Sequence, residues 1–240
     1  ECEIHSNSTR DNSFIINSNV TADVAKICVG ATKIINNNPN PLPIELGCPT
    51  AQDQYAGTIP VPDAKKCDYS SQNFQGSTLT LNPGVYCGHF NFNSSSTVTT
   101  FNPGLYVFKN SKWNVNGGDW IGDGVTFYFM DNKSQFQFNS GVKADIKAPE
   151  TGPYAGIVIA EKEGINKSNI IMNDSRGFGV EGLIYLPSRN LTMNGQSNLK
   201  GRKMGLVVRT LKLNSTTLDL LPPPNSQKTE EDNGTAFLEL

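Results

Sequence analysis

The sequence has little of what usually marks an enzyme or a nucleic-acid-binding protein. Histidine occurs only at His5 and His89, which is too few for a histidine-rich metal site. The 20 basic and 22 acidic residues nearly balance, so we expect no basic surface that would bind nucleic acid. The sequence contains no run of 18 or more apolar residues, the length that a transmembrane helix requires.

Apolar residues are also scarce. They make up 37% of the 240 residues, below the usual share, whereas asparagine, serine, threonine and glycine are abundant. The interior must therefore be narrow, which favours a long solenoid over a compact ball. The opening residues 1–10 are too polar for a signal peptide. Because the chain begins within a strand-like run, we expect an anchoring or targeting segment upstream, and membrane contact only through that segment.

The sequence repeats one short phrase six times: an apolar residue, any residue, an apolar residue and an asparagine. A glycine followed by alternating apolar residues precedes each copy. Periods of about 20 to 50 residues indicate stacked coils. Because each unit holds short strands and no helical pattern, the repeat predicts an all-β fold, a right-handed parallel β-helix. The phrases end in steps of 23, 23, 34, 21 and 20 residues, the long step being an insertion, at Asn93, Asn116, Asn139, Asn173, Asn194 and Asn214.

These six asparagines predict a ladder. Asparagine tolerates the left-handed backbone conformation that a sharp corner requires, and its amide can both donate and accept along the stack. The alternative is that asparagine merely follows each strand as a turn residue. Asn93 and Asn214 also begin N-x-S/T sequons, but a glycan there would disrupt the stack, so we expect none.

Strand alternation predicts which side chains form the core. One wall comes from the asparagine phrases: Phe90, Trp113, Phe136, Ile170, Leu191 and Leu211, then Phe92, Val115, Phe138, Met172, Met193 and Leu213. A second wall follows if the first residue after each glycine points inward: Val85, Leu105, Val125, Ile157, Leu183 and Leu206. The residues between then form an outward apolar stripe: Tyr86, Tyr106, Thr126, Val158, Ile184 and Val207. Such a stripe is expected to be covered, either by a proline-rich part of the chain or by a partner.

All five cysteines fall in the first 87 residues, which indicates disulfides near one end of the rod and an oxidising compartment. Cys67 and Cys87 lie one coil apart, and Cys2 and Cys28 lie 26 residues apart, so stacking predicts these two pairs. Cys48 is left over. The alternative is free buried thiols.

Residues 1–221 are expected to form the β-helix domain. Residues 1–36 are interpreted as its opening coils. Residues 37–66 contain six prolines and no period, so they are interpreted as a long connection that packs on the surface or caps the rod. Residues 222–240 form a polar linker and a tail that could add one last strand.

A catalytic site finds little support. A lyase or hydrolase on a β-helix needs clustered carboxylates, and the candidates Asp119, Asp123, Asp131 and Asp145 occupy turn phrases and do not recur at one coil position. Aspartate is an ordinary turn former. We therefore expect no enzyme activity, no cofactor and no metal.

Several phrases resemble a known family. They are LTLNPGVYCGHFNFN, FNPGLYVFKNSKWNVNG, GDGVTFYF, PETGPYAGIVIA, VEGLIYLPSRNLTMNG and DQYAGTIPVP. In order and across nearly the whole chain, they resemble the C-terminal region of Tad-type (tight adherence, Flp) pilus-assembly proteins of the TadG-like group. The chain departs from that pattern at Gln54, where the family more often has proline, and in its high asparagine content.

The resemblance implies an N-terminal helix outside this sequence, export to the periplasm or cell surface, and a role in building bacterial pili. The expected function is a minor pilin-like subunit or tip adhesin, with pilus proteins and a host or abiotic surface as partners. The family offers no catalytic residues to carry over. The alternative is a carbohydrate-binding or carbohydrate-active β-helix protein.

Overall fold

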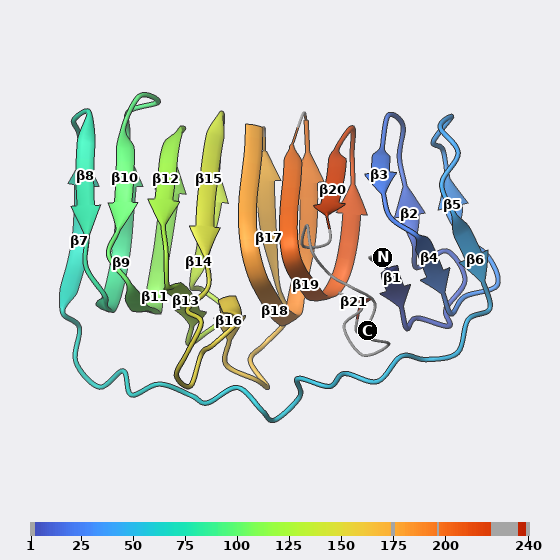
Figure 1. Cartoon of the computed structure of the whole chain (residues 1–240), viewed down its shortest axis with the longest axis horizontal. Coiled ribbons are helices and arrows are strands. Elements are labelled where there is room, and N and C mark those ends of the chain that lie inside the picture. The colour runs from blue at the N-terminus through green and yellow to red at the C-terminus, as the bar shows by residue number, and fades with distance from the viewer. Residues whose placement is uncertain (1–2, 174–175, 196, 222–234, 239–240) are drawn as a thin grey trace.

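The computed structural model describes residues 3–173, 176–195, 197–221 and 235–238, and these form a parallel β-helix of about ten turns (Figure 1). This confirms the predicted all-β fold, and no helix occurs in these ranges. Every strand pairing in them is parallel, as expected when one unit repeats coil after coil. At ~4.8 Å per strand, ten turns make a rod roughly 48 Å long.

Three sheets run along the rod, and each coil visits them in the same order. Residues 69–221, here called the main block, contain fourteen strands, some of which bend around a corner into the next sheet. They are β7 (Tyr69–Phe74), β8 (Thr78–Leu81), β9 (Gly84–Phe92), β10 (Val98–Phe101), β11 (Gly104–Val115), β12 (Gly118–Gly122), β13 (Val125–Phe129), β14 (Gln135–Phe138), β15 (Val142–Lys147), β16 (Ile157–Glu161), β17 (Ser168–Asn173), β18 (Arg176–Asn194), β19 (Asn198–Leu213) and β20 (Thr217–Leu221).

Residues 3–46, here called the N-terminal block, form smaller coils. Their strands are β1 (Glu3–Ser6), β2 (Ile15–Ile16), β3 (Thr21–Asp23), β4 (Lys26–Val29), β5 (Ile35–Asn36) and β6 (Ile44–Leu46). The last described strand of the chain, β21 (Thr235–Leu238), lies between β19 and β1. The two terminal strands of the chain are therefore neighbours in the middle of the rod.

The three sheets can be listed by their strand order. Sheet 1 contains β7, β9, β11, β13, β16, β18, β19, β21, β1, β4 and β6. Sheet 2 contains β7, β9, β11, β14, β17, β18, β19, β2 and β5. Sheet 3 contains β8, β10, β12, β15, β18, β19, β20 and β3.

The N-terminal block does not open the stack, so the interpretation of residues 1–36 as opening coils was wrong. It docks on the opposite end, where β2 pairs with β19 and β3 pairs with β20. Residues 47–66, here called the strap, then return along the whole rod to β7 (Figure 1). Twenty extended residues reach about 66 Å, so the strap is long enough for this path.

The asparagine-phrase wall of the core is confirmed. Phe92, Val115 and Phe138 lie in one column that continues through Met172, Met193 and Leu213, and all are buried. In the first coils this column lies in a cluster of aromatic rings around Trp113, whose side chain is fully buried. In this column Met172, Met193 and Leu213 replace the rings from β17 onward.

The other wall was predicted with the wrong face inward in four of six coils. Tyr86, Tyr106, Val158 and Ile184 belong to the core rather than to an outward stripe. The glycines do not keep register: Gly84 lies opposite Tyr106, whereas Gly104 lies opposite Val125. A slip of one residue exchanges the two faces of a strand, so position after glycine cannot assign them. Of the predicted stripe, only Thr126 and Val207 point away from the core.

The asparagine ladder is present in two runs. In the first, Asn139 donates to Asn116 at 2.8 Å and Asn116 donates to Asn93. In the second, the donors run from Asn17 to Asn214, from Asn214 to Asn194 at 2.6 Å, and from Asn194 to Asn173 at 3.0 Å. The second run crosses the seam between the blocks, because Asn17 belongs to the N-terminal block.

The backbone reason given for these asparagines was wrong, since none of the six adopts a positive φ. The left-handed residue comes after them, as at Gly117 (φ 118°), Gly195 (φ 65°) and Ser215 (φ 52°). The asparagines are therefore required by side-chain hydrogen bonding, and the corner is made by the next residue.

Candidate functional site

The strap is attached to both ends of the rod by disulfides. Cys28 on β4 bonds to Cys48 at the start of the strap, and Cys67 at its end bonds to Cys87 on β9. The predicted Cys67–Cys87 pair is therefore present, whereas the predicted Cys2–Cys28 pair is wrong because Cys28 is bonded to Cys48. Cys2 itself lies outside the described residues. Although all four cysteines are close to the N-terminus in sequence, the two bonds lie at opposite ends of the rod (Figure 1).

The outer face of sheet 1 is apolar, and the strap covers it. Tyr55 and Ile59 of the strap pack on outward side chains of β13, β16, β18 and β19. A proline-rich part of the chain therefore covers an apolar stripe, but the stripe is not the one that was predicted. The stripe consists of Leu105, Tyr128, Ile157, Ala160, Leu183, Tyr185 and Val207, of which the sequence analysis had placed only Val207 on this face.

Polar contacts fix the strap along its length. At one end the Asn7 side chain donates to the Ala51 carbonyl at 2.7 Å and accepts from the Ala51 N–H at 2.9 Å. Near the other end the Lys109 ammonium donates to the Ala64 carbonyl at 2.8 Å. Each of these bonds restricts the conformations that the strap can adopt. The strap is therefore an ordered part of the rod rather than a flexible connection.

The middle of the strap forms a junction with two main-block segments. The Tyr185 hydroxyl donates to Asp53 at 2.9 Å, and the Tyr154 hydroxyl donates to the Pro60 carbonyl at 3.0 Å. The Gly57 N–H donates to Glu163 at 2.6 Å. The junction thus joins three of the phrases that carried the family resemblance, at 53–62, 149–160 and 180–195. No spacing in the sequence indicates that these distant phrases lie together.

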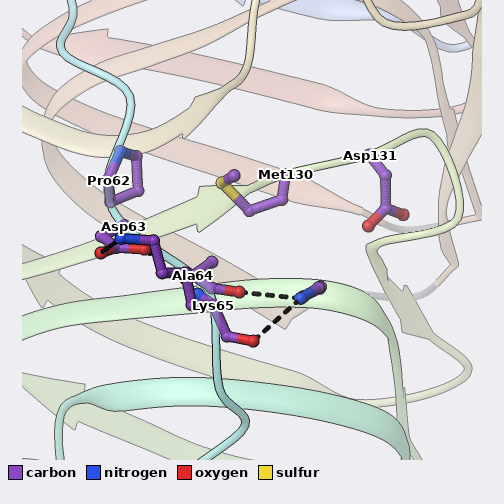
Figure 2. A pocket seen from close by; sticks show the side chains of 7 residues that line it. Pro62, Asp63, Ala64, Lys65, Met130 and Asp131 are labelled. Carbon is purple, nitrogen blue, oxygen red and sulfur yellow. Dashed lines mark hydrogen bonds and ion pairs between the residues drawn. The ribbon is translucent and has the colours of Figure 1, made fainter.

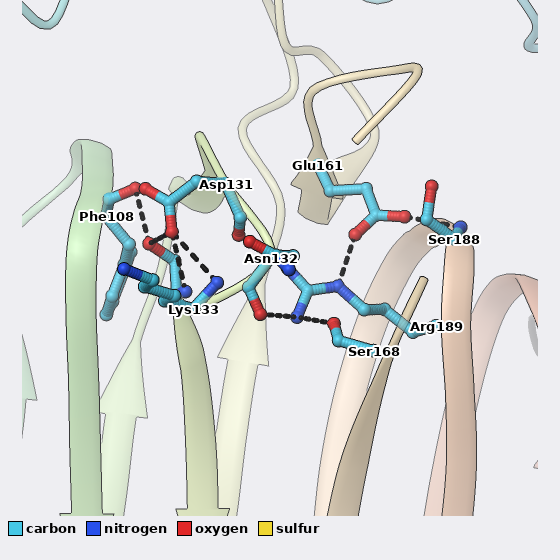
Figure 3. Close-up of polar contacts among 9 residues, drawn as sticks. Phe108, Asp131, Asn132, Lys133, Glu161, Ser168, Ser188 and Arg189 are labelled. Carbon is cyan, nitrogen blue, oxygen red and sulfur yellow. Dashed lines mark hydrogen bonds and ion pairs between the residues drawn. The ribbon is translucent and has the colours of Figure 1, made fainter. Parts of the chain in front are cut away.

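A buried ion pair lies beside this junction (Figure 3). Arg189 and Glu161 are fully buried, and the Arg189 Nε donates to Glu161 at 2.5 Å. The remaining Arg189 donors reach the Ser168 hydroxyl and the carbonyls of Asp131 and Asn132. The Ser188 N–H donates to the second Glu161 oxygen at 2.6 Å. Every strong donor and acceptor of the pair has a partner, so the pair serves as a brace between three coils.

Burial raises the pKa of the Glu161 carboxyl above its ordinary value, while Arg189 acts to lower it. Both side chains are fully buried, and the oxygens of Glu161 are occupied by internal donors. A general acid or base must reach the proton of a substrate. The geometry of the pair therefore fits a structural role and not that of a general acid or base.

A shallow hollow of about 440 Å³ lies between the end of the strap and the rod (Figure 2). Its charged groups are already bonded within the protein: Lys109 to the strap carbonyls, and Asp63 to Lys65 at 3.1 Å. Asp131 accepts from the N–H groups of Asn110, Lys133 and Ser134, so it shapes a turn. The hollow offers no set of free groups that converge on one ligand atom.

The other candidate carboxylates also have local roles. Asp119 and Asp145 lie on the outer face of sheet 3, where Asp119 is opposite Lys143 and Asp145 is opposite Ile121, and Asp123 lies 3.9 Å from Lys147. Within the described ranges, no group of three histidine, cysteine or acidic residues is placed to hold a metal ion. Asp119, Asp123 and Asp145 lie on or next to sheet 3, whereas Asp131 lies in the turn between β13 and β14, so the four candidates do not share one site.

Sheet 2 presents a different outer face, made largely of uncharged amides. Asn114 donates to Asn91 at 2.8 Å and Asn91 donates to Asn73 at 2.7 Å, which forms a second ladder on the same strands as the first. Asn190 and Asn169 form a further rung at 2.9 Å. These rows were missed, although Asn91 and Asn114 stand two residues before the ladder positions Asn93 and Asn116 and could have been found by alignment of the phrases.

The disulfides indicate an oxidising location, extracellular or periplasmic. In the described part of the chain no helix is long and apolar enough to cross a membrane. No family model, curated protein or solved structure matches the chain.

Proposed function

We propose that the chain is an exported, non-catalytic rod that serves a bacterial Tad pilus as a minor pilin-like subunit or tip adhesin. The observation that carries this proposal is the strap: a segment that covers one face of the rod and is bonded covalently to its two ends. A strap of this kind is not needed to form a binding pocket. It opposes separation of the coils when the rod is pulled, and it limits the local unfolding that proteases require. A surface appendage meets both conditions.

The pilus assignment is supported by the phrases that resemble the TadG-like group, three of which form the strap junction. The ladders support the same role, because within each run neighbouring coils are joined by side-chain as well as backbone hydrogen bonds. Partners would be other pilus or pilus-assembly proteins and a host or abiotic surface, with an upstream segment as the anchor.

The proposal is tested by deletion of the gene in its own bacterium. We expect loss of pili or of surface attachment, restored by the wild-type gene and not by a gene that lacks the strap cysteines Cys48 and Cys67. Unchanged pili and attachment in the deletion strain would contradict the proposal. Surface labelling of an epitope-tagged protein gives an independent readout of export.

A second candidate function is carbohydrate binding, and one observation favours it. The outer face of sheet 2 carries rows of amides from Asn73, Asn91 and Asn114, which can donate to and accept from sugar hydroxyls. A glycan array probed with the isolated rod tests it. Binding that is lost in Asn91→Ala/Asn114→Ala, but kept in a matched Lys143→Ala/Lys147→Ala variant of sheet 3, would support this function.

A further inference from the structure

The two ends of the rod differ in whether their edge strands are protected against pairing with another strand. At the N-terminal-block end the strands are short, β5 with two residues and β6 with three. Pro39, Pro41 and Pro43 precede β6, and proline blocks further strand pairing. The Asn38 side chain bonds to both the N–H and the carbonyl of Val20 at 3.0 and 2.9 Å, in the place of another strand. This end is protected against strand addition.

The other end is not protected. β7 has six residues and pairs with β9 alone among the described strands, so its outer edge is open (Figure 1). Residues 69–81 contain neither proline nor charge, and Ser70, Ser71, Gln72 and Asn73 are exposed. Natural proteins usually guard such an edge with charge, proline or a covering segment. One end of the rod is protected against strand addition and the opposite end is not, which indicates that the open end is an interaction surface.

The sequence of β7, YSSQNF, is complementary to itself when reversed. In an antiparallel pair of two copies centred between Ser71 and Gln72, Tyr69 lies opposite the second copy's Phe74, and Ser70 lies opposite its Asn73. Each aromatic residue then meets an aromatic residue, and each hydroxyl meets an amide, which are favourable cross-strand pairs. The absence of charge removes like-charge repulsion.

The shape of β7 agrees with this pairing. Tyr69 and Ser70 pair with β9 in sheet 1, residues 72–74 pair with it in sheet 2, and the register shifts between them. The strand therefore bends at the centre of the self-complementary sequence. A two-fold axis through the bend brings the sheet 1 half of one copy over the sheet 2 half of the other. Tyr69 and Phe74 both face the core of their own rod, so they would meet in a continuous interior.

We propose that the β7 edge binds the β7 edge of a second copy, in antiparallel register, to give a two-fold dimer of rods joined end to end. The guarded end stops growth at two copies, whereas two open ends would produce a filament. The proposal does not depend on the pilus assignment, because it rests on the edge itself.

Sedimentation velocity over a range of protein concentrations tests it. We expect a species of twice the chain mass for the wild type. Ser70→Lys/Asn73→Lys places lysine opposite lysine twice, and Ser70→Asp/Asn73→Asp places aspartate opposite aspartate. Each variant alone should weaken the dimer by about tenfold or more, and a one-to-one mixture of the two should restore it.

The control is Leu46→Lys on β6 at the guarded end, which should leave the dimer unchanged. Circular dichroism and an intact Cys67–Cys87 bond show that each variant is folded. A wild type that is monomeric throughout, a filament in place of a dimer, or a mixture that fails to recover the dimer would each overturn the proposal.

Discussion

The main block and the N-terminal block are built from the same coil but are held together differently. The coils of the main block follow one another in chain order and enclose a core of large aromatic rings centred on Trp113 and Trp120. The N-terminal block has short strands and a smaller core in which Phe14 packs with aliphatic side chains such as Ile16, Val20 and Ile27. It joins the main block through β2 and β3 on one side of the seam, through β21, and through the strap.

The difference shows that the order of coils in space need not follow their order in sequence. A single coil has unpaired backbone groups on its upper and lower edges. It can therefore stack on either end of a solenoid, since both ends offer the same pattern of backbone hydrogen bonds. The strap decides the outcome, because it is long enough to let residues 3–46 reach the far end. Its two disulfides then keep the N-terminal block in that place.

The largest effect is expected from the main-block core. Trp113→Ala removes a fully buried ring that contacts seven other rings, and should lower the free energy of unfolding by about 3–5 kcal/mol. Phe14→Ala in the N-terminal block should cost less and act locally. Chemical denaturation with hydrogen exchange measures both. Equal global losses from the two substitutions would show that the blocks are not distinct.

The buried ion pair gives a second test within the main block. Arg189→Met leaves the Glu161 carboxyl buried without its cation, and should cost about 3–5 kcal/mol of stability. The double variant Arg189→Met/Glu161→Leu should recover most of this loss, because it removes both charges. A single variant as stable as the wild type would contradict the role of the pair as a brace.

Alkaline pH should separate the blocks. Burial raises the pKa of the Tyr86, Tyr106 and Tyr128 hydroxyls well above the ordinary value of 10.0, and the N-terminal block contains no tyrosine. A pKa raised in the folded state gives stability that is present below pH 10 and is lost as the pH rises above it, since the unfolded chain releases the protons first. Each tyrosine should contribute about 1.4 kcal/mol per pH unit.

Denaturation curves at a series of pH values above 10 measure this slope. Tyr106→Phe should reduce it by about 1.4 kcal/mol per pH unit, because one of the buried hydroxyls is gone. A slope that Tyr106→Phe leaves unchanged would show that these hydroxyls do not cause the alkaline loss.

The two disulfides offer a matched pair, because both close loops with a sequence separation of 20. Cys28→Ser/Cys48→Ser and Cys67→Ser/Cys87→Ser should each cost about 3 kcal/mol. Their positions should differ in hydrogen exchange: the first pair should loosen residues 26–46, and the second should loosen residues 69–92. Exchange that rises in the same region for both variants would contradict attachment at opposite ends.

Much of this structure could be predicted from the repeat. The apolar columns at Phe92 and Val115 and the ladder at Asn116 follow from spacing alone, because the asparagine phrase keeps its register from coil to coil. The glycine phrase does not keep register, so the faces of Tyr86 and Val158 were exchanged. The position of the N-terminal block could not be predicted, because local patterns do not state which free end a coil will choose. The Cys28–Cys48 bond was missed, although its sequence separation of 20 equals that of Cys67–Cys87.

The central claim is that the N-terminal block stacks on β20 and not on β7. Thr21 and Thr217 are register partners whose hydroxyls lie 3.2 Å apart, and adjacent strands at ~4.8 Å are within disulfide range. Thr21→Cys/Thr217→Cys should form a bond under oxidising conditions, identified by peptide mass spectrometry, whereas Thr21→Cys/Thr78→Cys should not. A bond between positions 21 and 78, with none between 21 and 217, would show that the coils stack in chain order and would contradict the account.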